Sequence, residues 1–164
     1  MSTVMSEAST GLGIPTATAS PEPRVVAFKH GPEAQKFGWW WGTGRRKTAI
    51  ARVRIRPGDG AFKVNGREVN EYFTEERDRA DVVAPLKSTD MLGKLEVQVT
   101  TKGGGYMGQA GAIVLGLARA LRIYDANVEP ILRENNYLTR DPREVERKKY
   151  GQAGARRRFQ FSKR

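Results

Sequence analysis

The chain of 164 residues has no cysteine and a single histidine, His30. The lack of cysteine excludes a disulfide framework, thiolate nucleophiles and thiolate metal sites. His30 lies in a low-complexity segment, so we expect it to be exposed and to have no catalytic role. A Gly-x-Ser-x-Gly elbow and the Gly-Lys-Ser/Thr of a Walker A loop are also missing. These absences predict a protein that is not an enzyme and that has neither a metal site nor a cofactor.

Long apolar stretches are missing as well. No run of about 18 apolar residues occurs, so we expect no segment that spans a membrane. The first 20 residues have neither a basic start nor a continuous apolar stretch, unlike a secretory signal. They are rich in Ser and Thr, as transit peptides are, but no arginine precedes Arg24. We therefore expect a cytoplasmic protein, with which the lack of cysteine agrees.

Basic residues are abundant: 29 Lys and Arg against 18 Asp and Glu give a net charge of +11 and a pI near 10.3. Such a balance fits a nucleic-acid-binding protein. It also fits a protein that binds anionic membrane surfaces, so charge alone leaves both classes open. A membrane-surface module would need a basic amphipathic helix, and the basic C-terminus, interrupted by Pro142, Gly151 and Gly154, predicts none.

The C-terminus holds most of this charge. Residues 139–164 contain ten Lys or Arg and three acids, which leaves seven of the eleven net positive charges there. Apolar residues in this segment follow neither a helical nor a strand period, so we expect an extended tail that becomes ordered on a polyanion. Tyr150, Phe159 and Phe161 lie among the basic residues, a pattern that suits RNA. A solvated tail without a specific partner is the alternative.

Composition divides the chain into three segments. Residues 1–38 are dominated by Ser, Thr, Ala, Gly and Pro, which predicts a disordered or loosely docked extension. Residues 39–138 form the expected globular domain, and residues 139–164 form the basic tail. Trp39, Trp40 and Trp41 open the domain. Because neighbours on a strand point to opposite faces, Trp40 should face one way and the other two the opposite way. Packing is favoured over base stacking as their main role.

Alternating residues predict strands. Thr43 to Arg56 is expected to form a strand: from Ala49 on, small or apolar residues alternate with a mainly basic set, which indicates an apolar inner face and a largely cationic outer face. Leu95 to Lys102 alternates in the same way. A short strand is expected at residues 61–64, and Asn65-Gly66 predicts a hairpin turn directly after it.

Helical patterns lie between and after these strands. A short helical turn is expected near residues 69–73. Thr74 to Ser88 has acids early and Lys87 late, which suits a helix that Pro85 ends or kinks. Gln109 to Tyr124 places its apolar residues on one stripe at helical spacing. Glu129-Pro130 predicts the start of a shorter helix.

Glycines separate the second long strand from the long helix. Gly103 to Gly108 matches G-x-G-x-x-G, but no acid-terminated second strand follows, so we reject a dinucleotide-binding site. A small nucleotide-dependent enzyme that uses this loop remains the alternative from a different functional class. A backbone cradle for RNA phosphates is favoured, with Lys102 and Arg119 adding charge. A second possibility is that these glycines only permit tight packing.

Three stretches together resemble the bacterial-type ninth protein of the small ribosomal subunit. They are Gly42 to Val53, the glycine-rich run from Gly103 to Leu121, and the run from Leu138 to the terminal Gln160-Phe161-Ser162-Lys163-Arg164. The resemblance covers about residues 39–164. It implies an α+β fold: a mainly antiparallel four-stranded sheet, helices packed on one side, a left-handed βαβ crossover, and a long extended basic tail.

The resemblance also implies a function. The protein would be a structural constituent of the small ribosomal subunit, bound to 16S rRNA in the head beside neighbouring head proteins. Its tail would reach the P site and contact the anticodon stem-loop of tRNA during translation, through Ser162, Lys163 and Arg164. No membrane and no small-molecule substrate are expected.

Basic, glycine and polar positions of the body and tail make up the predicted rRNA-binding set. It comprises Arg45, Arg46, Lys47, Arg52, Arg54, Lys102, Gly103, Gly104, Gly105, Tyr106, Gln109, Arg119, Arg147, Lys148, Lys149, Arg156, Arg157 and Arg158. The chain departs from the family at Gln152-Ala153-Gly154-Ala155, where further basic residues are common, and in the length of its N-terminal extension.

Overall fold

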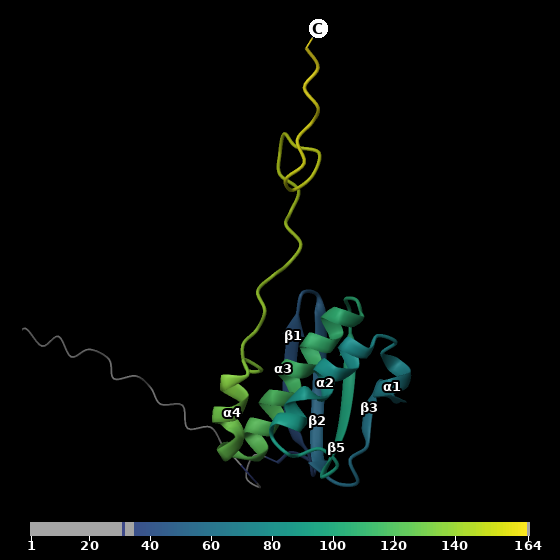
Figure 1. Ribbon diagram of the computed structural model, residues 1–164, viewed down its shortest axis with the longest axis vertical. Helices are drawn as coiled ribbons and strands as arrows, with labels where there is room; N and C mark the ends of the chain where they lie inside the picture. The colour runs from purple at the N-terminus through teal and green to yellow at the C-terminus, as the bar shows by residue number, and fades with distance from the viewer. Residues whose placement is uncertain (1–30, 32–34, 164) are drawn as a thin grey trace, which may run out of the picture.

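The computed structural model describes residues 31 and 35–163. Most of the predicted N-terminal extension and the tRNA-binding candidate Arg164 lie outside these residues. Within them, a sheet and its covering helices form one body, from which the C-terminal residues lead away (Figure 1). The strands are β1 Trp40–Arg46, β2 Ala49–Pro57, β3 Phe62–Val64, β4 Arg67–Glu68 and β5 Leu95–Lys102. The helices are α1 Val69–Tyr72, α2 Glu76–Ser88, α3 Tyr106–Tyr124, the 3-10 turn η2 Ala126–Val128 and α4 Glu129–Glu134.

The strands form one mixed sheet in the order β1-β2-β5-β3-β4. All neighbouring pairs are antiparallel except β3 and β5, which are parallel. The expected four-stranded sheet is therefore corrected to five strands, because the two-residue β4 pairs with β3 across the Asn65-Gly66 turn. Both turn residues have positive φ, as this kind of hairpin requires. The chain crosses from β3 through α1 and α2 to β5; the left hand of this crossover stays a prediction.

β1 is a separate strand that the sequence pattern did not distinguish from β2. It pairs with β2 from Trp40 opposite Ile55 to Arg46 opposite Ala49, so only Lys47 and Thr48 form the turn. The sequence pattern joined residues 43–48 to the strand that ends at Arg56, whereas in the structure the chain reverses at Lys47 and Thr48. The other main expectations are confirmed: the alternation that starts at Ala49 lies on β2, β5 spans Leu95–Lys102, and the short helices α1 and α4 are present.

The core lies between the sheet and its helices. On β2, Ala49, Ala51, Val53 and Ile55 are buried while the residues between them are largely exposed. Ile113, Leu117 and Leu121 of α3 are fully buried, and each such side chain contributes about 1.5–3 kcal/mol relative to exposure. Because the helices gather on one side of the sheet (Figure 1), the other face is left without a covering helix in the described part of the chain.

α3 approaches β1 so closely that side chains cannot fit between them. A Cβ added to Gly42 would lie 2.1 Å from the carbonyl oxygen of Gly116, and one added to Gly44 would lie 1.9 Å from that of Ala112. Gly116 in turn faces Val53 and the backbone of Gly44. Glycine is therefore required at these crossing points, and α3 begins at Tyr106, three residues before the predicted start.

The tryptophans divide as predicted. Trp40 is buried, packs edge-on against Tyr124 with ring centroids 4.9 Å apart, and donates its indole N–H to the Gly31 carbonyl at 2.7 Å. Trp39 and Trp41 lie on the opposite face beside arginines of β2. In α2, Pro85 is buried inside the helix, which continues to Ser88, so this proline does not end the helix.

Replacing Gly44 with alanine tests the contact between β1 and α3. The new methyl group must push the helix from the strand, so we expect the free energy of unfolding to fall by about 3 kcal/mol. Urea denaturation measures this as a lower midpoint at an unchanged slope. Gly105→Ala is the matched control: a Cβ there meets nothing within 4 Å, and the change should stay within about 1 kcal/mol. Equal midpoints for Gly44→Ala and the unchanged chain would contradict the packing described here.

Candidate nucleic-acid interface

The face of the sheet opposite the helices carries rows of polar and basic side chains, set by strand register. Trp41 lies opposite Arg54, Arg54 opposite Gln98, and Gln98 beside Lys63. The next row joins Thr43, Arg52 and Thr100, and a third joins Arg45, Ile50 and Lys102. Two of the predicted RNA-binding residues, Arg52 and Arg54, thus lie in adjacent rows of a surface that we call the outer face.

At one end of the outer face, side chains are linked by hydrogen bonds to one another. Arg56 donates to Glu96 at 2.6 Å, and Gln98 donates to the other oxygen of that carboxylate at 2.7 Å. The hydrogen bonds from Gln98 and Arg56 hold the pKa of Glu96 below its ordinary value. Arg54 in turn donates to the Gln98 side-chain oxygen at 2.6 Å. At this end the charge of Arg56 is therefore balanced by Glu96, whereas Arg54 is held by a neutral amide and keeps its charge.

The other end of the outer face keeps its charge. In the part of the chain that the structure describes, Arg45, Arg52 and Lys102 have neither a hydrogen-bonding partner nor an ion pair through their side chains. Arg52 on β2 and Lys102 on β5 lie on neighbouring strands and in adjacent rows of the same face, so they are close together. Their charges are accessible to a polyanion.

Two hollows mark the outer face. The first, of about 430 Å³, is lined by Trp41, Ile50, Arg52, Arg54, Gln98, Thr100 and Lys102. The second, also of about 430 Å³, shares some of these side chains and is lined by Arg54, Lys63, Asn65, Gly66, Gln98, Val99 and Thr100. We call the two together the outer-face trough. No carboxylate lines it. Lys63 is a basic residue of the trough that the predicted rRNA-binding set did not include. The expected strand at residues 61–64 would have shown that Lys63 and Phe62 point to opposite faces of the sheet.

Arg46 points away from the outer face and contacts the first residues of the tail. It crosses α3 at Gly111, where an added Cβ would lie 2.4 Å from its side chain, and donates to the Asp141 carboxylate at 3.0 Å. Asp141 also accepts from the side chain of Arg143 at 2.8–3.1 Å and from its backbone N–H at 3.0 Å. The predicted RNA ligand Arg46 is thus engaged inside the protein, where it fixes the start of the tail.

Two further candidates make internal contacts. Arg119 of α3 donates to the Thr43 carbonyl of β1 at 2.6 Å. Gln109 donates to the Gly103 carbonyl at 3.1 Å and accepts from the Tyr72 hydroxyl at 2.6 Å. Both side chains therefore tie α3 to its surroundings, and their predicted binding to rRNA stays a prediction.

The glycine-rich loop packs against the first hairpin. Gly103 and Gly104 have positive φ, and a Cβ on them would lie 2.7 Å from the Thr48 carbonyl oxygen and 3.0 Å from the Ala49 side chain. Such contacts favour the packing alternative for these two glycines. Gly105, the N-cap of α3, leaves open space for a Cβ, and Tyr106 is exposed.

Acids border the same loop. Glu75 and Asp78, at the start of α2, line a hollow with Lys47, Gly104, Gly105 and Tyr106. Burial, followed by repulsion from Glu75 and Asp81, raises the pKa of Asp78 above its ordinary value. Carboxylates beside the start of α3 oppose a phosphate there, so the electrostatics weigh against the predicted backbone cradle.

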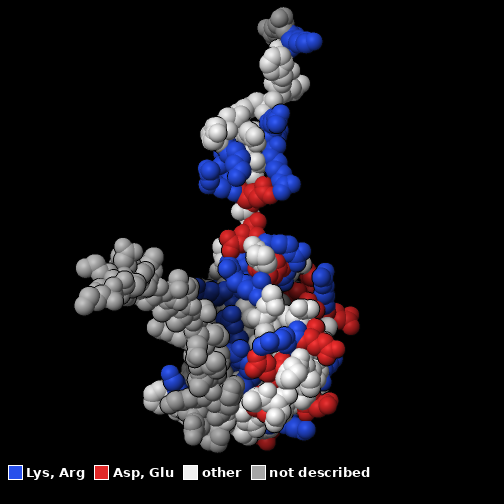
Figure 2. All heavy atoms as spheres, turned by 90° about the vertical axis from the view of Figure 1, so that its left-hand side faces the viewer, with Lys and Arg blue, Asp and Glu red and all other residues white. Residues whose placement is uncertain are grey.

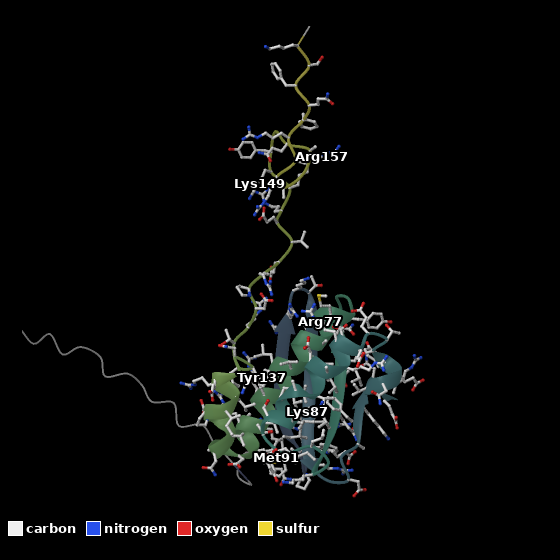
Figure 3. All side chains as sticks on the ribbon, in the orientation of Figure 1. Arg77, Lys87, Met91, Tyr137, Lys149 and Arg157 are labelled. Carbon is white, nitrogen blue, oxygen red and sulfur yellow. The ribbon has the colours of Figure 1, made fainter. Side chains whose placement is uncertain are left out.

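The tail leaves the body at Thr139, and its described residues up to Lys163 contain neither helix nor strand. A loop forms within it: Glu146 accepts from Arg156, and the backbone N–H of Ala153 donates to the Arg157 carbonyl at 2.9 Å. Lys149 and Arg157 both belong to this loop (Figure 3), and Lys and Arg side chains cluster on this part of the tail (Figure 2). This loop includes Gln152 to Ala155, where the chain lacks the basic residues that are common in the family it resembles.

A cationic sheet face that no helix of the described residues covers, together with a basic chain end outside the body, is the electrostatic pattern of a nucleic-acid-binding protein. The profile of the family described as "Ribosomal protein S9/S16" matches residues 44–164. The chain belongs to this family of ribosomal proteins, which are structural proteins and not enzymes. Membership confirms the resemblance and the expected class, a ribosomal RNA-binding protein of translation.

Individual relatives agree with this assignment. The protein of Thermotoga neapolitana named "Small ribosomal subunit protein uS9" is 55% identical over 128 residues, which cover 76% of this chain and 96% of the relative. Its namesake in Thermotoga maritima is 54% identical over 128 residues. One from Anaeromyxobacter sp. (strain K) is 54% identical over 121 residues, or 74% of this chain and 93% of the relative. Among the described residues, no helix is both long and apolar enough for a membrane span.

Titration of Asp141 tests the root of the tail. Hydrogen bonds from Arg143 chiefly, and the charge of Arg46 to a smaller extent, hold its pKa well below the ordinary 3.8. Stabilisation from this carboxylate is therefore present at pH values above the ordinary 3.8 and is lost progressively as the pH falls from there through the lower folded-state pKa. In NMR titrations of the carboxyl carbon, Arg143→Gln should raise the pKa of Asp141 more than Arg46→Gln does. A midpoint near 3.8 in the unchanged chain would contradict this arrangement.

Proposed function

We propose that this chain is a structural constituent of the small ribosomal subunit and binds 16S rRNA there through its outer face and its tail. The observation that carries the proposal is the agreement of two independent features. The chain covers nearly the full length of relatives named as small-subunit proteins, and its unpaired cations lie on a bare sheet face and a projecting tail. Family membership makes the cytoplasmic ribosome its location.

The rRNA-binding role is assigned to basic residues that remain accessible. On the body these are Arg45, Lys47, Arg52, Arg54 and Lys102; on the tail they are Arg147, Lys148, Lys149, Arg156, Arg157 and Arg158. Most of their contacts should go to phosphates and sugars, since the side chains are cations without a fixed pattern of base-reading donors. A second group of candidates would contribute indirectly, by holding the elements of the body in place. It comprises Arg46, Arg119, Gln109, Gly103, Gly104, Gly105 and Tyr106.

The second part of the proposal concerns tRNA. The tail lies outside the body and ends on Ser162 and Lys163, both exposed, before Arg164. A segment of this length reaches up to about 90 Å when fully extended, enough to carry its end far from the body's own binding surface. We infer that the body sits in the subunit head beside neighbouring proteins and that the tail end contacts the anticodon stem-loop of P-site tRNA.

Cosedimentation of the tagged chain with ribosomal particles of its host, over a salt series, tests the first part. We expect the chain in the small-subunit peak and its release after RNase digestion. Absence from that peak at low salt would contradict the proposal.

Substitution of the tail arginines tests their phosphate contacts. Replacing Arg156, Arg157 and Arg158 with glutamine should reduce the slope of log K against log salt for rRNA binding by about 2–3, since each phosphate contact contributes about 0.7–0.9. Filter binding to 16S rRNA over a salt series measures the slope. Arg133→Gln is the control, because Arg133 pairs with Glu129 on the body, and its slope should equal that of the unchanged chain. An unaltered slope in the tail variant would exclude these contacts.

Deletion of Phe161 to Arg164 tests the tRNA contact. We expect folding and incorporation into the subunit to stay intact, because residues 161–163 are exposed and the described end of the tail lies away from the body (Figure 1). Retention of P-site tRNA should weaken, measured as faster dissociation of labelled tRNA from reconstituted subunits. A matched variant with Phe161 to Arg164 replaced by four other residues of the same net charge separates charge from sequence. Loss of incorporation on deletion would contradict this division of roles.

A further inference from the structure

The outer-face trough combines an aromatic surface with positive charge. Trp41 is 39% exposed and Ile50 is 41% exposed, and both line the first hollow together with Arg52 and Lys102. An exposed indole and an exposed aliphatic side chain that line the same concavity are unusual on a surface that otherwise carries ions. The two side chains lie on neighbouring strands, two rows apart along β2, because Trp41 is opposite Arg54 and Arg45 is opposite Ile50.

The ring of Trp41 is held in place. Its indole N–H donates to the Lys36 carbonyl at 3.3 Å, and the guanidinium of Arg54 lies 5.7 Å from its ring centroid. Arg54 lies 4.9 Å from the Trp39 ring as well, so it spans the two indoles. An aromatic ring fixed in this way is a ready stacking surface, because little conformational entropy is lost when a flat ligand binds it.

The rest of the trough supplies what a nucleotide needs besides stacking. Arg52 and Lys102 offer charges without internal partners among the described residues, suited to the flanking phosphates. Thr100 is exposed, and its hydroxyl makes no hydrogen bond within the described chain, so it is available to a ribose or a base edge. No carboxylate of the described residues lines the trough, which disfavours a basic ligand on charge grounds.

We propose that the outer-face trough is a site for an unpaired RNA nucleotide, with its base stacked on Trp41 and its phosphates held by Arg52 and Lys102. The inference rests on the proposed rRNA-binding function and specifies the RNA feature that is bound. That feature is an extruded or single-stranded nucleotide and not a duplex backbone. A continuous duplex presents phosphates and sugars but no free base face, so it leaves the indole unused.

Binding of two matched RNAs to the full chain tests this site. Both are synthetic hairpins of equal length; one is fully paired, and the other has three mismatched, unpaired bases in its stem. Anisotropy titrations at one salt concentration give Kd values. We expect the unchanged chain to prefer the unpaired RNA, and Trp41→Ala to weaken that complex about tenfold while changing the paired complex little. Trp41→Phe should keep most of the preference, because it retains a ring.

Two controls sharpen the result. Trp39→Ala removes an indole on the same face that does not line the trough, so the preference should survive. Tryptophan fluorescence should be quenched by the unpaired RNA in the unchanged chain and much less in Trp41→Phe. Circular dichroism and urea midpoints check that each variant folds.

The outcomes separate this site from the general function. Equal affinities of Trp41→Ala and the unchanged chain for the unpaired RNA, with normal salt dependence, would overturn the nucleotide site and leave the proposed function intact. The same result would follow if another segment or a protein occupied the trough. Failure of the unchanged chain to bind either RNA, or 16S rRNA, at low salt would overturn the proposed function and the site together.

Discussion

The contact between the backbones of α3 and β1 determines which face of the sheet the helices cover. Gly42 and Gly44 on the strand and Gly116 on the helix allow an approach that a single methyl group would prevent. With α3 held there, its apolar stripe covers the small side chains of β2, and the body needs no second layer of helices. The opposite face is consequently left to solvent and ligands, and its cations stay unburied, which avoids the large cost of enclosing charge.

Two cationic surfaces follow from this arrangement, and they bind by different physical means. The outer face is rigid, since strand register fixes the spacing of Arg52, Arg54 and Lys102, so binding there orders little of the protein. The tail has no core of its own, and its ordering on RNA must be offset by phosphate contacts. The internal pair of Glu146 and Arg156 shows that the free tail already satisfies part of its charge. A phosphate must therefore compete with this carboxylate for Arg156.

Alternation and turn chemistry made much of the fold predictable. Ala49 to Ile55, Leu95 to Val99, and Asn65-Gly66 each carry a local signal that the packed structure keeps. β1 was not distinguished as a separate strand because Gly42 and Gly44 are selected by a helix more than 60 residues away, at Ala112 and Gly116, and no local pattern contains that information. For the same reason the sequence could not show that Arg46 reaches Asp141, or that Glu75 and Asp78 border the glycine-rich loop.

Arg45 and Arg46 show that neighbouring basic residues in a sequence motif can have different roles. Arg45 and Arg46 are neighbours at the end of β1, so strand geometry sends them to opposite sides of the sheet. Arg45 shares the outer-face row of Ile50 and Lys102, whereas Arg46 crosses Gly111 to the root of the tail. Only one of the two charges is left for a polyanion, and the other sets where the tail begins. A run of basic residues on a strand therefore has at most half its charge on any one surface, and the remainder is available to organise the protein itself.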